Sequence, residues 1–506
     1  MLPESIGTLC KLQALILRGC QKLSKLPQVI TKLISIRFLD IRDTGSLKEM
    51  PLGIGNLKNL IILSKFVVGL EKGSQLKELK NLPHLEGELF ISKLQKVEKV
   101  IDAVDANLLQ KQGVTNLSLH WDKHLGDLHN HECEGQVLDS LRPHTNLENL
   151  TILNYGGAIF PSWLDCTSYS KIVSLCLWDC PNVISLPMLG QLPSLKELSL
   201  KGLHAIRMIG SEFYGGRRPF SSLTTLGFKE MLAWKDWCPY AGGPKEEVSL
   251  FCLKHLVVWG CPLLVGTLPC QLDHLEKLEI HLCPHLNNST NDVCLPSLHE
   301  LYLEGCNKEI LNSLVNLTSL TILMIENLLE LVFFDHGFMS HLIKLKELHI
   351  GGCDKLKYLW QDGNEKLNLT CLKELIIVSC PQFTSFVAGE REIELPCNLE
   401  RMELSNCMSL EKLPSKMYML DYLSIRQCPK LIGPTISPND PSNNNPLSQL
   451  ESLYIDKCDS LISFPFANGR LATLKTFSIN ECKGVQSLEE ISIESLEKLT
   501  IVVVRI

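Results

Sequence analysis

Apolar residues recur along the chain in a fixed phrase, L-x-x-L-x-L-x-x-C-x-x-L-x-x-L-P, with clear copies at 12–27, 172–187 and 399–414. In its central L-x-L, the two apolar side chains point to one side of an extended chain, and the residue between them points to the other side. The second half of the phrase turns the chain back. Each copy is therefore predicted to form one short strand followed by a return segment.

The phrase repeats throughout the sequence at intervals of mostly 21 to 30 residues, which is typical of leucine-rich repeats. Twenty copies begin near residues 12, 36, 60, 85, 114, 147, 172, 195, 223, 253, 275, 298, 320, 345, 372, 399, 420, 450, 474 and 496. One copy cannot bury its own apolar side, so neighbouring copies must stack. We expect an α/β solenoid, a leucine-rich repeat horseshoe of about 20 repeats. Its concave face would be a parallel β-sheet, and its convex face would carry irregular loops and short helices.

We expect residues 1–506 to form a single array with two irregular regions. In the first, at 97–146, Val104, Leu108 and Leu109 have helical spacing within 102–114, and 137–141 resembles a second short helix before Pro143. This region is predicted to be a helical excursion between strands. The second region, 433–449, is rich in Pro, Asn and Ser and is predicted to be an exposed loop insert.

Cysteine is unusually frequent, and eleven of the 21 cysteines occupy one slot just after the predicted strand. They are Cys20, Cys180, Cys261, Cys283, Cys306, Cys353, Cys380, Cys407, Cys428, Cys458 and Cys482. A buried thiol in this slot acts as a small apolar group with a weak hydrogen-bond donor. The sequence shows no secretory signal, so we expect these thiols to be reduced and the chain to be cytoplasmic.

Two groups of His and Cys residues could in principle bind a metal ion. One contains His120, His124, His129, His131 and Cys133, and the other contains His281, Cys283 and His285. Neither has paired ligands at the short C-x-x-C spacing of a structural zinc site. A polar loop and an ordinary repeat strand explain them better, so no metal site is predicted.

Composition and motifs argue against several other functions. With 49 basic and 56 acidic residues the net charge is −7, without the basic runs of a nucleic-acid-binding protein. No apolar stretch is long enough to span a membrane. The phosphate loop, the H-E-x-x-H motif and the G-x-S-x-G motif are missing. We therefore predict a protein without catalytic activity or a cofactor.

A partner protein would bind most readily to the residues that flank the apolar strand positions on the concave face. Aromatic residues and arginine are the types enriched at binding hot spots. The candidate partner-binding residues of these types, together with two histidines, are Trp178, Trp259, His281, Tyr302, His349, Tyr422, Arg426 and Tyr454.

Several longer phrases resemble one family beyond the generic repeat. They include LPESIGTLCKLQALILRGCQKLSKLP at 2–27, FVVGLEKGSQLKELKNLPHLEGELFISKL at 66–94 and LPMLGQLPSLKELSLKGLHAIRMIGSEFYG at 186–215. These phrases resemble the repeat region of plant nucleotide-binding leucine-rich repeat disease-resistance proteins, most closely the coiled-coil class. The family's upstream signalling domain and nucleotide-binding switch have no counterpart here, so the chain is expected to begin inside the repeats.

The resemblance implies a recognition module. In the family, this region senses pathogen effectors, or host proteins that effectors modify, and helps to hold the nucleotide-binding domain of the same receptor inactive. The implied partners are an effector or guarded host protein, and that domain if the receptor is full length. Two alternatives stay open: an F-box-type ubiquitin-ligase substrate adaptor, although its docking domain is missing, and a switchless decoy or truncated product.

Overall fold

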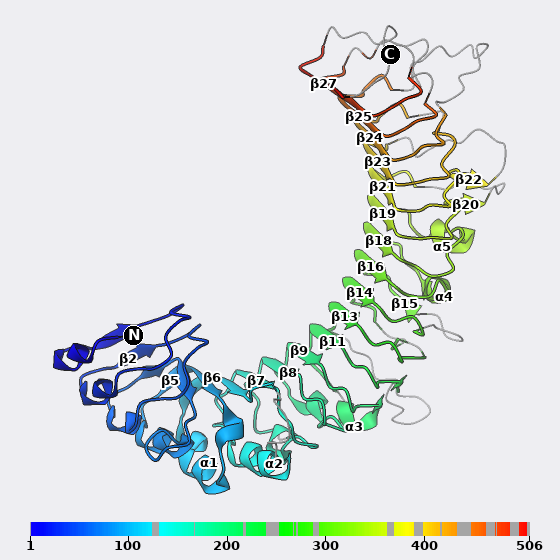
Figure 1. Ribbon diagram of the computed structural model, residues 1–506. Helices are drawn as coiled ribbons and strands as arrows, with labels where there is room; N and C mark the ends of the chain where they lie inside the picture. The colour runs from blue at the N-terminus through cyan, green and yellow to red at the C-terminus, as the bar shows by residue number, and fades with distance from the viewer. Residues whose placement is uncertain are drawn as a thin grey trace, which may run out of the picture. The chain divides into compact units, whose positions relative to one another are not determined.

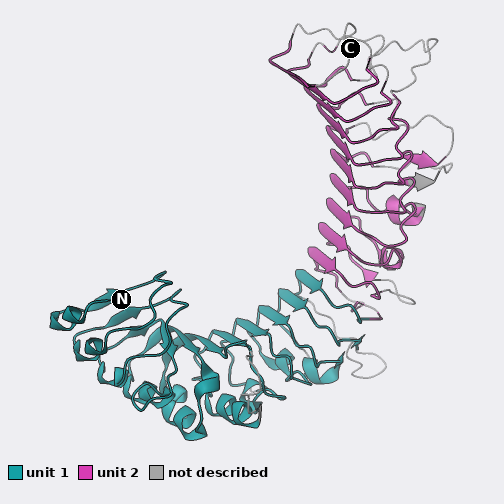
Figure 2. Cartoon of the chain, viewed as in Figure 1, with its two compact units in different colours: residues 1–264 teal, residues 265–506 magenta. Residues whose placement is uncertain are grey.

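The computed structural model describes residues 2–123, 131–165, 167–215, 219–238, 252–266, 268–269, 272–286, 293–361, 369–388, 398–414, 417–432, 447–461, 471, 473–485 and 495–502. The chain divides into two compact units, residues 1–264 and residues 265–506 (Figure 2). In each unit parallel strands line one side of the stack, and loops with short helices form the other side (Figure 1).

The strands of unit 1 form two parallel sheets and one short pair. The first sheet contains β1 (Ala14–Ile16), β2 (Phe38–Asp40) and β3 (Ile62–Leu63). The second contains β4 (Lys65–Val67), β5 (Glu86–Ser92), β6 (Gly113–His120), β7 (Asn149–Leu153), β8 (Ser174–Trp178), β9 (Glu197–Lys201), β11 (Thr225–Lys229) and β13 (His255–Trp259). The pair is β10 (Met208–Ile209) with β12 (Asp236–Trp237).

The helices of unit 1 are all short. The α-helices are α1 (Val100–Ala106), α2 (His131–Ser140) and α3 (Ser211–Tyr214). The 3₁₀ helices are η1 (Glu4–Thr8), η2 (Gln28–Lys32), η3 (Ile54–Asn56), η4 (Leu76–Asn81), η5 (Leu94–Lys96), η6 (Leu108–Gln110), η7 (Ser162–Asp165) and η8 (Leu189–Gln191).

Unit 2 is more regular, and the strands of its main sheet pair in chain order. They are β14 (Lys277–His281), β16 (Glu300–Glu304), β18 (Ile322–Glu326), β19 (Glu347–Gly351), β21 (Glu374–Val378), β23 (Arg401–Ser405), β24 (Tyr422–Arg426), β25 (Ser452–Asp456), β26 (Thr476–Asn480) and β27 (Lys498–Val502). Two short pairs and two helices lie outside it: β15 (Val293–Cys294) with β17 (Leu314–Val315), β20 (Trp360–Gln361) with β22 (Val387–Ala388), α4 (Glu309–Ser313) and α5 (His336–Ser340).

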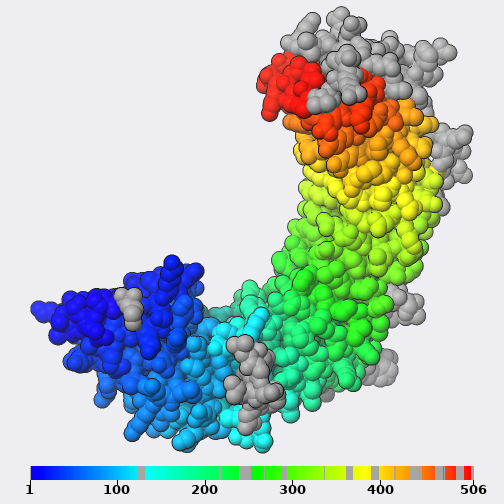
Figure 3. Space-filling view, viewed as in Figure 1, coloured from blue at the N-terminus to red at the C-terminus, as the bar shows by residue number. Residues whose placement is uncertain are grey.

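A strand follows each of the twenty predicted repeat starts, so the leucine-rich repeat solenoid is confirmed. In most strands the second and fourth residues are buried, as Leu301 and Leu303 are in β16. β16 and β18 pair without a register shift, so these leucines stack on Leu323 and Ile325 of β18. A register shift occurs between β5 and β6, at Gly87 and Glu88. The space-filling view shows the turns of each unit in contact along the stack (Figure 3). A single array over 1–506 stays a prediction.

The cysteine slot forms a ladder of equivalent hydrogen bonds. From Cys180 to Cys482, each thiol in the slot donates to the carbonyl oxygen two residues earlier, at 3.2–3.6 Å. These ten thiols are buried, and desolvation raises the pKa of Cys180 and of Cys306 to about 12. Cys20 is the exception to the predicted burial, because it is exposed in the first repeat, where no earlier repeat among the described residues covers it.

Among its described residues, the region 97–146 contains the α-helices α1 and α2, the 3₁₀ helix η6 and the strand β6. α1 starts at Val100 and ends at Ala106, before most of the segment with helical spacing, and β6 then joins the main sheet. Val104 and Leu109 are exposed, whereas Ala103, Ala106 and Leu108 are buried. Of the three residues with helical spacing, only Leu108 is buried. Most of the predicted loop at 433–449, from 433 to 446, lies outside the described residues.

The residue just after a main-sheet strand often has a left-handed backbone. Asn, Asp or Gly fills this position in many repeats, as Asn327 and Gly352 do, but Leu282 has φ = 53° there and is 46% exposed. A side chain such as leucine is disfavoured in this conformation by about 1–2 kcal/mol, whereas Asn tolerates it better. Leu282 is therefore a point of local strain in unit 2.

We predict that Leu282→Asn stabilises unit 2 by about 0.5–1 kcal/mol, because relief of this backbone cost outweighs the loss of apolar contacts from a side chain that is already 46% exposed. The measurement is the midpoint of urea unfolding followed by circular dichroism. The matched control is Gly352→Ala, which should lower the midpoint, because Gly352 has φ = 60° and a Cβ there would collide with the side-chain oxygen of Asn327. A lower midpoint for Leu282→Asn would contradict the prediction.

Lys111 is a buried cation that completes the end of a 3₁₀ helix. It is 3% exposed, and its Nζ donates to the carbonyl oxygens of Leu79 and Leu82, both at 2.8 Å. Desolvation lowers its pKa from 10.5 to about 8. A neutral amine still has two N–H groups for these two carbonyls, so loss of the proton does not break the arrangement.

We predict a pH dependence of stability that comes from Lys111. Its pKa is lower in the folded chain, so between pH 8 and 10.5 the unfolded chain binds more protons, and the free energy of unfolding contributed by this residue increases with pH. The gain relative to Lys111→Met should be at most on the order of 2–3 kcal/mol. Urea unfolding at about pH 7.5 and about pH 9.5 tests it, and parallel pH profiles for the two proteins would refute it.

Candidate protein-binding face

The strand face of each unit consists of the main-sheet residues that point away from the core. Each five-residue strand presents its first, third and fifth residues there, and parallel pairing aligns them into three rows. All eight predicted residues occupy these rows. Trp178 and Trp259 lie in unit 1, and the other six lie in unit 2.

In unit 1 the two tryptophans share a row but do not touch. Trp178 in β8 is followed in register by Lys201, Lys229 and then Trp259 in β13. The indole Nε1 of Trp178 donates to Ser199 Oγ at 2.9 Å, which holds the ring over the neighbouring strand. Both tryptophans are half-buried, so each keeps accessible ring surface.

In unit 2, His281 and Tyr302 belong to a charged network on β14 and β16. Nδ1 of His281 lies 3.0 Å from Glu304, and the Tyr302 hydroxyl donates to Glu300 at 3.1 Å. Lys277 lies 4.7 Å from the centre of the Tyr302 ring and 3.0 Å from Glu279. The hydrogen bond from Lys277 to Glu279 raises the pKa of that lysine, and burial is the main cause of a raised pKa for Tyr302.

A second group surrounds Tyr422 and Tyr454. Their ring centres are 5.5 Å apart, and the guanidinium of Arg401 lies 3.8 Å from the centre of the Tyr422 ring. Arg401 also lies 3.6 Å from Glu374, which is 3.4 Å from Nε2 of His349. Arg426 is exposed at the end of β24 and pairs in register with Asp456.

The residues predicted from the sequence did not include most of the charged side chains on the unit 2 strand face. They omitted Lys277, Arg401 and the carboxylates Glu279, Glu300, Glu304, Glu326, Glu347, Glu374 and Glu403. Aligning the repeats in columns would have revealed them, because they occupy the same outward positions as the predicted residues. The selection by hot-spot residue type passed over glutamate.

The two His and Cys groups of the sequence lie partly in the portion of the chain that the structure describes. No group of three or more His, Cys, Asp or Glu residues there could hold a metal ion. His281 contacts carboxylates, and the thiol of Cys283 is buried in the ladder. Of the other cluster, His124 and His129 lie outside the described residues.

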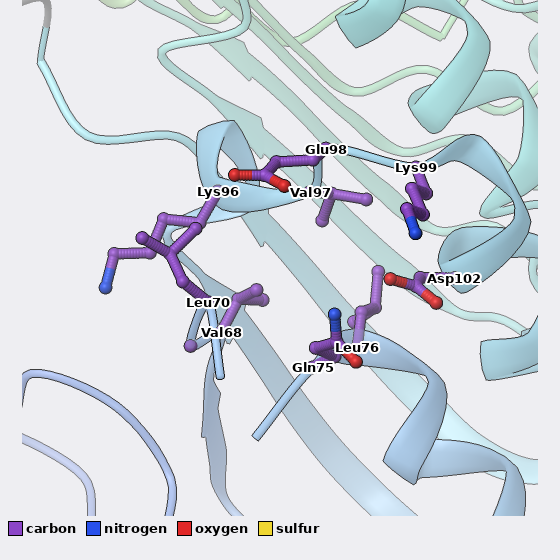
Figure 4. A pocket seen from close by; sticks show the side chains of 10 residues that line it. Val68, Leu70, Gln75, Leu76, Lys96, Val97, Glu98, Lys99 and Asp102 are labelled. Atoms are coloured by element: carbon purple, nitrogen blue, oxygen red, sulfur yellow. The ribbon is translucent and has the colours of Figure 1, made fainter. Parts of the chain in front are cut away.

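Unit 1 also contains a small recess on its loop side, between η4, η5 and α1 (Figure 4). Lys96, Glu98, Lys99 and Asp102 surround its apolar residues, such as Val68. The buried Asp102 carboxylate lies 3.3 Å from Nζ of Lys77. Since that charge is already compensated, the recess is a weaker candidate for ligand binding than the strand face. Among the described residues, no helix is long and apolar enough to cross a membrane.

Residues 76–203 match the family model described as R13L1/DRL21 LRRs. The chain is 34% identical over 363 residues to RPP13-like protein 1 of Arabidopsis thaliana, which covers 69% of this chain and 32% of that protein. It is 33% identical over 284 residues to disease resistance protein RGA2 of Solanum bulbocastanum, covering 55% of this chain and 27% of that protein.

Among solved structures, a leucine-rich repeat protein of Leptospira interrogans is 18% identical, with a TM-score of 0.45 and 94% coverage of both chains. The chain spans about a third or less of the length of the plant relatives. Over that span, it is homologous to the leucine-rich repeat region of plant coiled-coil nucleotide-binding disease-resistance proteins of the RPP13-like and RGA kinds.

Proposed function

We propose that this chain is a protein-recognition module of plant defence, which binds a pathogen effector, or a host protein that an effector modifies, through its strand faces. The observation that carries the proposal is that aromatic and charged side chains occupy the outward rows, where they do not contribute to the leucine core. Trp178, Trp259, Tyr302 and Tyr454 are half-buried, so their packing is fixed while part of each ring stays accessible. Side chains that are already held in place lose little conformational entropy when a partner binds to them.

The homology supports the defence role of this module. The matched relatives include a protein named for disease resistance, and the match lies in the repeat region. We place the module in the cytoplasm of a plant cell, where it would regulate a nucleotide-binding switch if the same protein contains one.

We predict that Trp178→Ala combined with Trp259→Ala weakens binding of the natural partner at least about tenfold, the scale expected from hot-spot aromatics. The measurement is titration of the purified chain with a partner selected from a displayed library of secreted pathogen proteins and host proteins. The matched control replaces two exposed apolar residues away from the main sheet, Met208 and Leu232, by alanine. Equal affinities for the two double variants would exclude the unit 1 strand face as the site.

We predict that the endogenous protein is longer than this chain of 56.8 kDa, because a recognition module that regulates a switch must be joined to it. An immunoblot with an antibody raised against the repeats, together with sequencing of the transcript's 5′ end, tests this. A band near 57 kDa would instead favour a decoy that binds without signalling.

A further inference from the structure

The strand face of unit 2 is strongly acidic between β14 and β21, unlike the strand face of unit 1 between β6 and β13. Its fifteen outward positions contain six glutamates and one lysine. The glutamates are Glu279, Glu300, Glu304, Glu326, Glu347 and Glu374. Over β6–β13 the equivalent positions in unit 1 contain one glutamate and two lysines. Because both faces have the same backbone geometry, the difference belongs to the side chains and not to the fold.

Apolar and aromatic residues of this surface, one of them a histidine, lie between the carboxylates. Pairing in register aligns Tyr302, Met324, His349 and Ile376 across β16, β18, β19 and β21, which lie side by side in Figure 1. We call these four residues the middle row, and at the usual strand spacing they extend over about 14 Å. All four are half-buried. Rows with carboxylates lie on both sides: Glu300, Glu347 and Glu374 on one, and Glu304 and Glu326 on the other.

Several of these carboxylates face each other directly. Glu304 is the register partner of Glu326, and Glu347 is the register partner of Glu374. Like charges at directly opposed positions destabilise a sheet. Glu304 has His281 at 3.0 Å, and Glu374 has Arg401 at 3.6 Å. Glu326 and Glu347 form no ion pair within the described part of the chain, so their charge is uncompensated.

We propose that the strand face between β16 and β21 binds a protein segment that presents apolar side chains flanked by lysine or arginine. The proposal rests on the proposed function and specifies the chemistry of the partner. The apolar side chains of the segment would pack on the middle row, and its cations would approach Glu326 on one side and Glu347 on the other. An apolar centre with a charged rim is the usual anatomy of a protein interface. Complementary charge would also speed the encounter and reject acidic partners.

The test uses the full chain and defined peptides of about 15 residues, followed by fluorescence anisotropy. One peptide alternates lysine with leucine, a second alternates glutamate with leucine, and a third alternates lysine with serine. We expect the lysine–leucine peptide to bind most tightly and its affinity to fall between about 50 mM and about 500 mM NaCl, because salt screens the exposed carboxylates. Equal binding of the lysine–leucine and glutamate–leucine peptides would overturn the proposal.

A pair of variants with the same change in net charge locates the binding site. Glu326→Gln with Glu347→Gln changes the net charge by two, and so does Ser174→Lys with Thr225→Lys on the unit 1 strand face. We expect the first pair to weaken lysine–leucine binding about tenfold, as two lost charge contacts should, and the second pair to have less than half that effect. Equal losses for both pairs would show attraction to net charge alone and would overturn the proposed site.

Stability gives an independent measurement. Removing the like-charge opposition should keep or raise the urea midpoint of Glu326→Gln with Glu347→Gln. A lowered midpoint would mean that the two glutamates stabilise the fold, which would overturn the argument. A natural partner that binds normally to this variant would refute the proposed site and leave the proposed function standing. Failure to find any natural partner, with the peptide preference intact, would count against the proposed function alone.

Discussion

The structure depends on one constraint: the apolar residues of each strand can be buried only by the repeats before and after it. Leu301 and Leu303 are covered because the neighbouring strands pair with β16 in the same register. A shift of one residue would bring Glu300 and Tyr302 into the core and expose both leucines. Burial therefore fixes register, and register places every outward residue of one repeat beside its equivalent in the next.

The thiol ladder reinforces this register at the end of each strand. A buried cysteine acts there as a small apolar group, and its thiol adds a weak second hydrogen bond to a carbonyl oxygen that already accepts a backbone N–H from the preceding repeat. The left-handed residue just before the cysteine makes the turn possible, and this explains why Asn and Gly recur there. Leu282 shows that the turn forms even where the residue is poorly suited, because the stacked core outweighs a local cost.

Much of this architecture could be predicted from the sequence because it depends on periodic burial. The leucine spacing predicts one strand for each of the twenty repeats, and ten of the eleven slot cysteines are buried as expected. Cys20 differed because burial depends on an adjacent repeat and not on the residue itself. The helices at 97–146 were harder to place, since α1 ends at Ala106, and Leu108 and Leu109 belong to the separate 3₁₀ helix η6.

The candidate site was less predictable for a related physical reason. The sequence placed Tyr302 and Tyr422 on the strand face, but their contacts with Lys277 and Arg401 involve the preceding strand, about 21–25 residues away. The same holds for the lysine at position 111, whose two acceptors lie in another repeat. Such contacts depend on the register between strands and on side-chain rotamers. The repeat periodicity predicts the register of the backbone, but it does not predict the rotamers.

In each repeat the buried residues stabilise the fold and the outward residues do not contribute to the core. This separation explains how opposed glutamates on the strand face can persist. Opposed glutamates cost at most about 1 kcal/mol per pair. In a stacked array, stability is a sum over repeats and their interfaces, so a few such costs are absorbed by the buried leucines and cysteines of β14 to β21. The outward rows can therefore change in charge without altering the fold. The two units show this directly. Parallel strands of the same kind support a weakly charged surface at β8 and β9 in unit 1 and an acidic surface at β18 and β19 in unit 2.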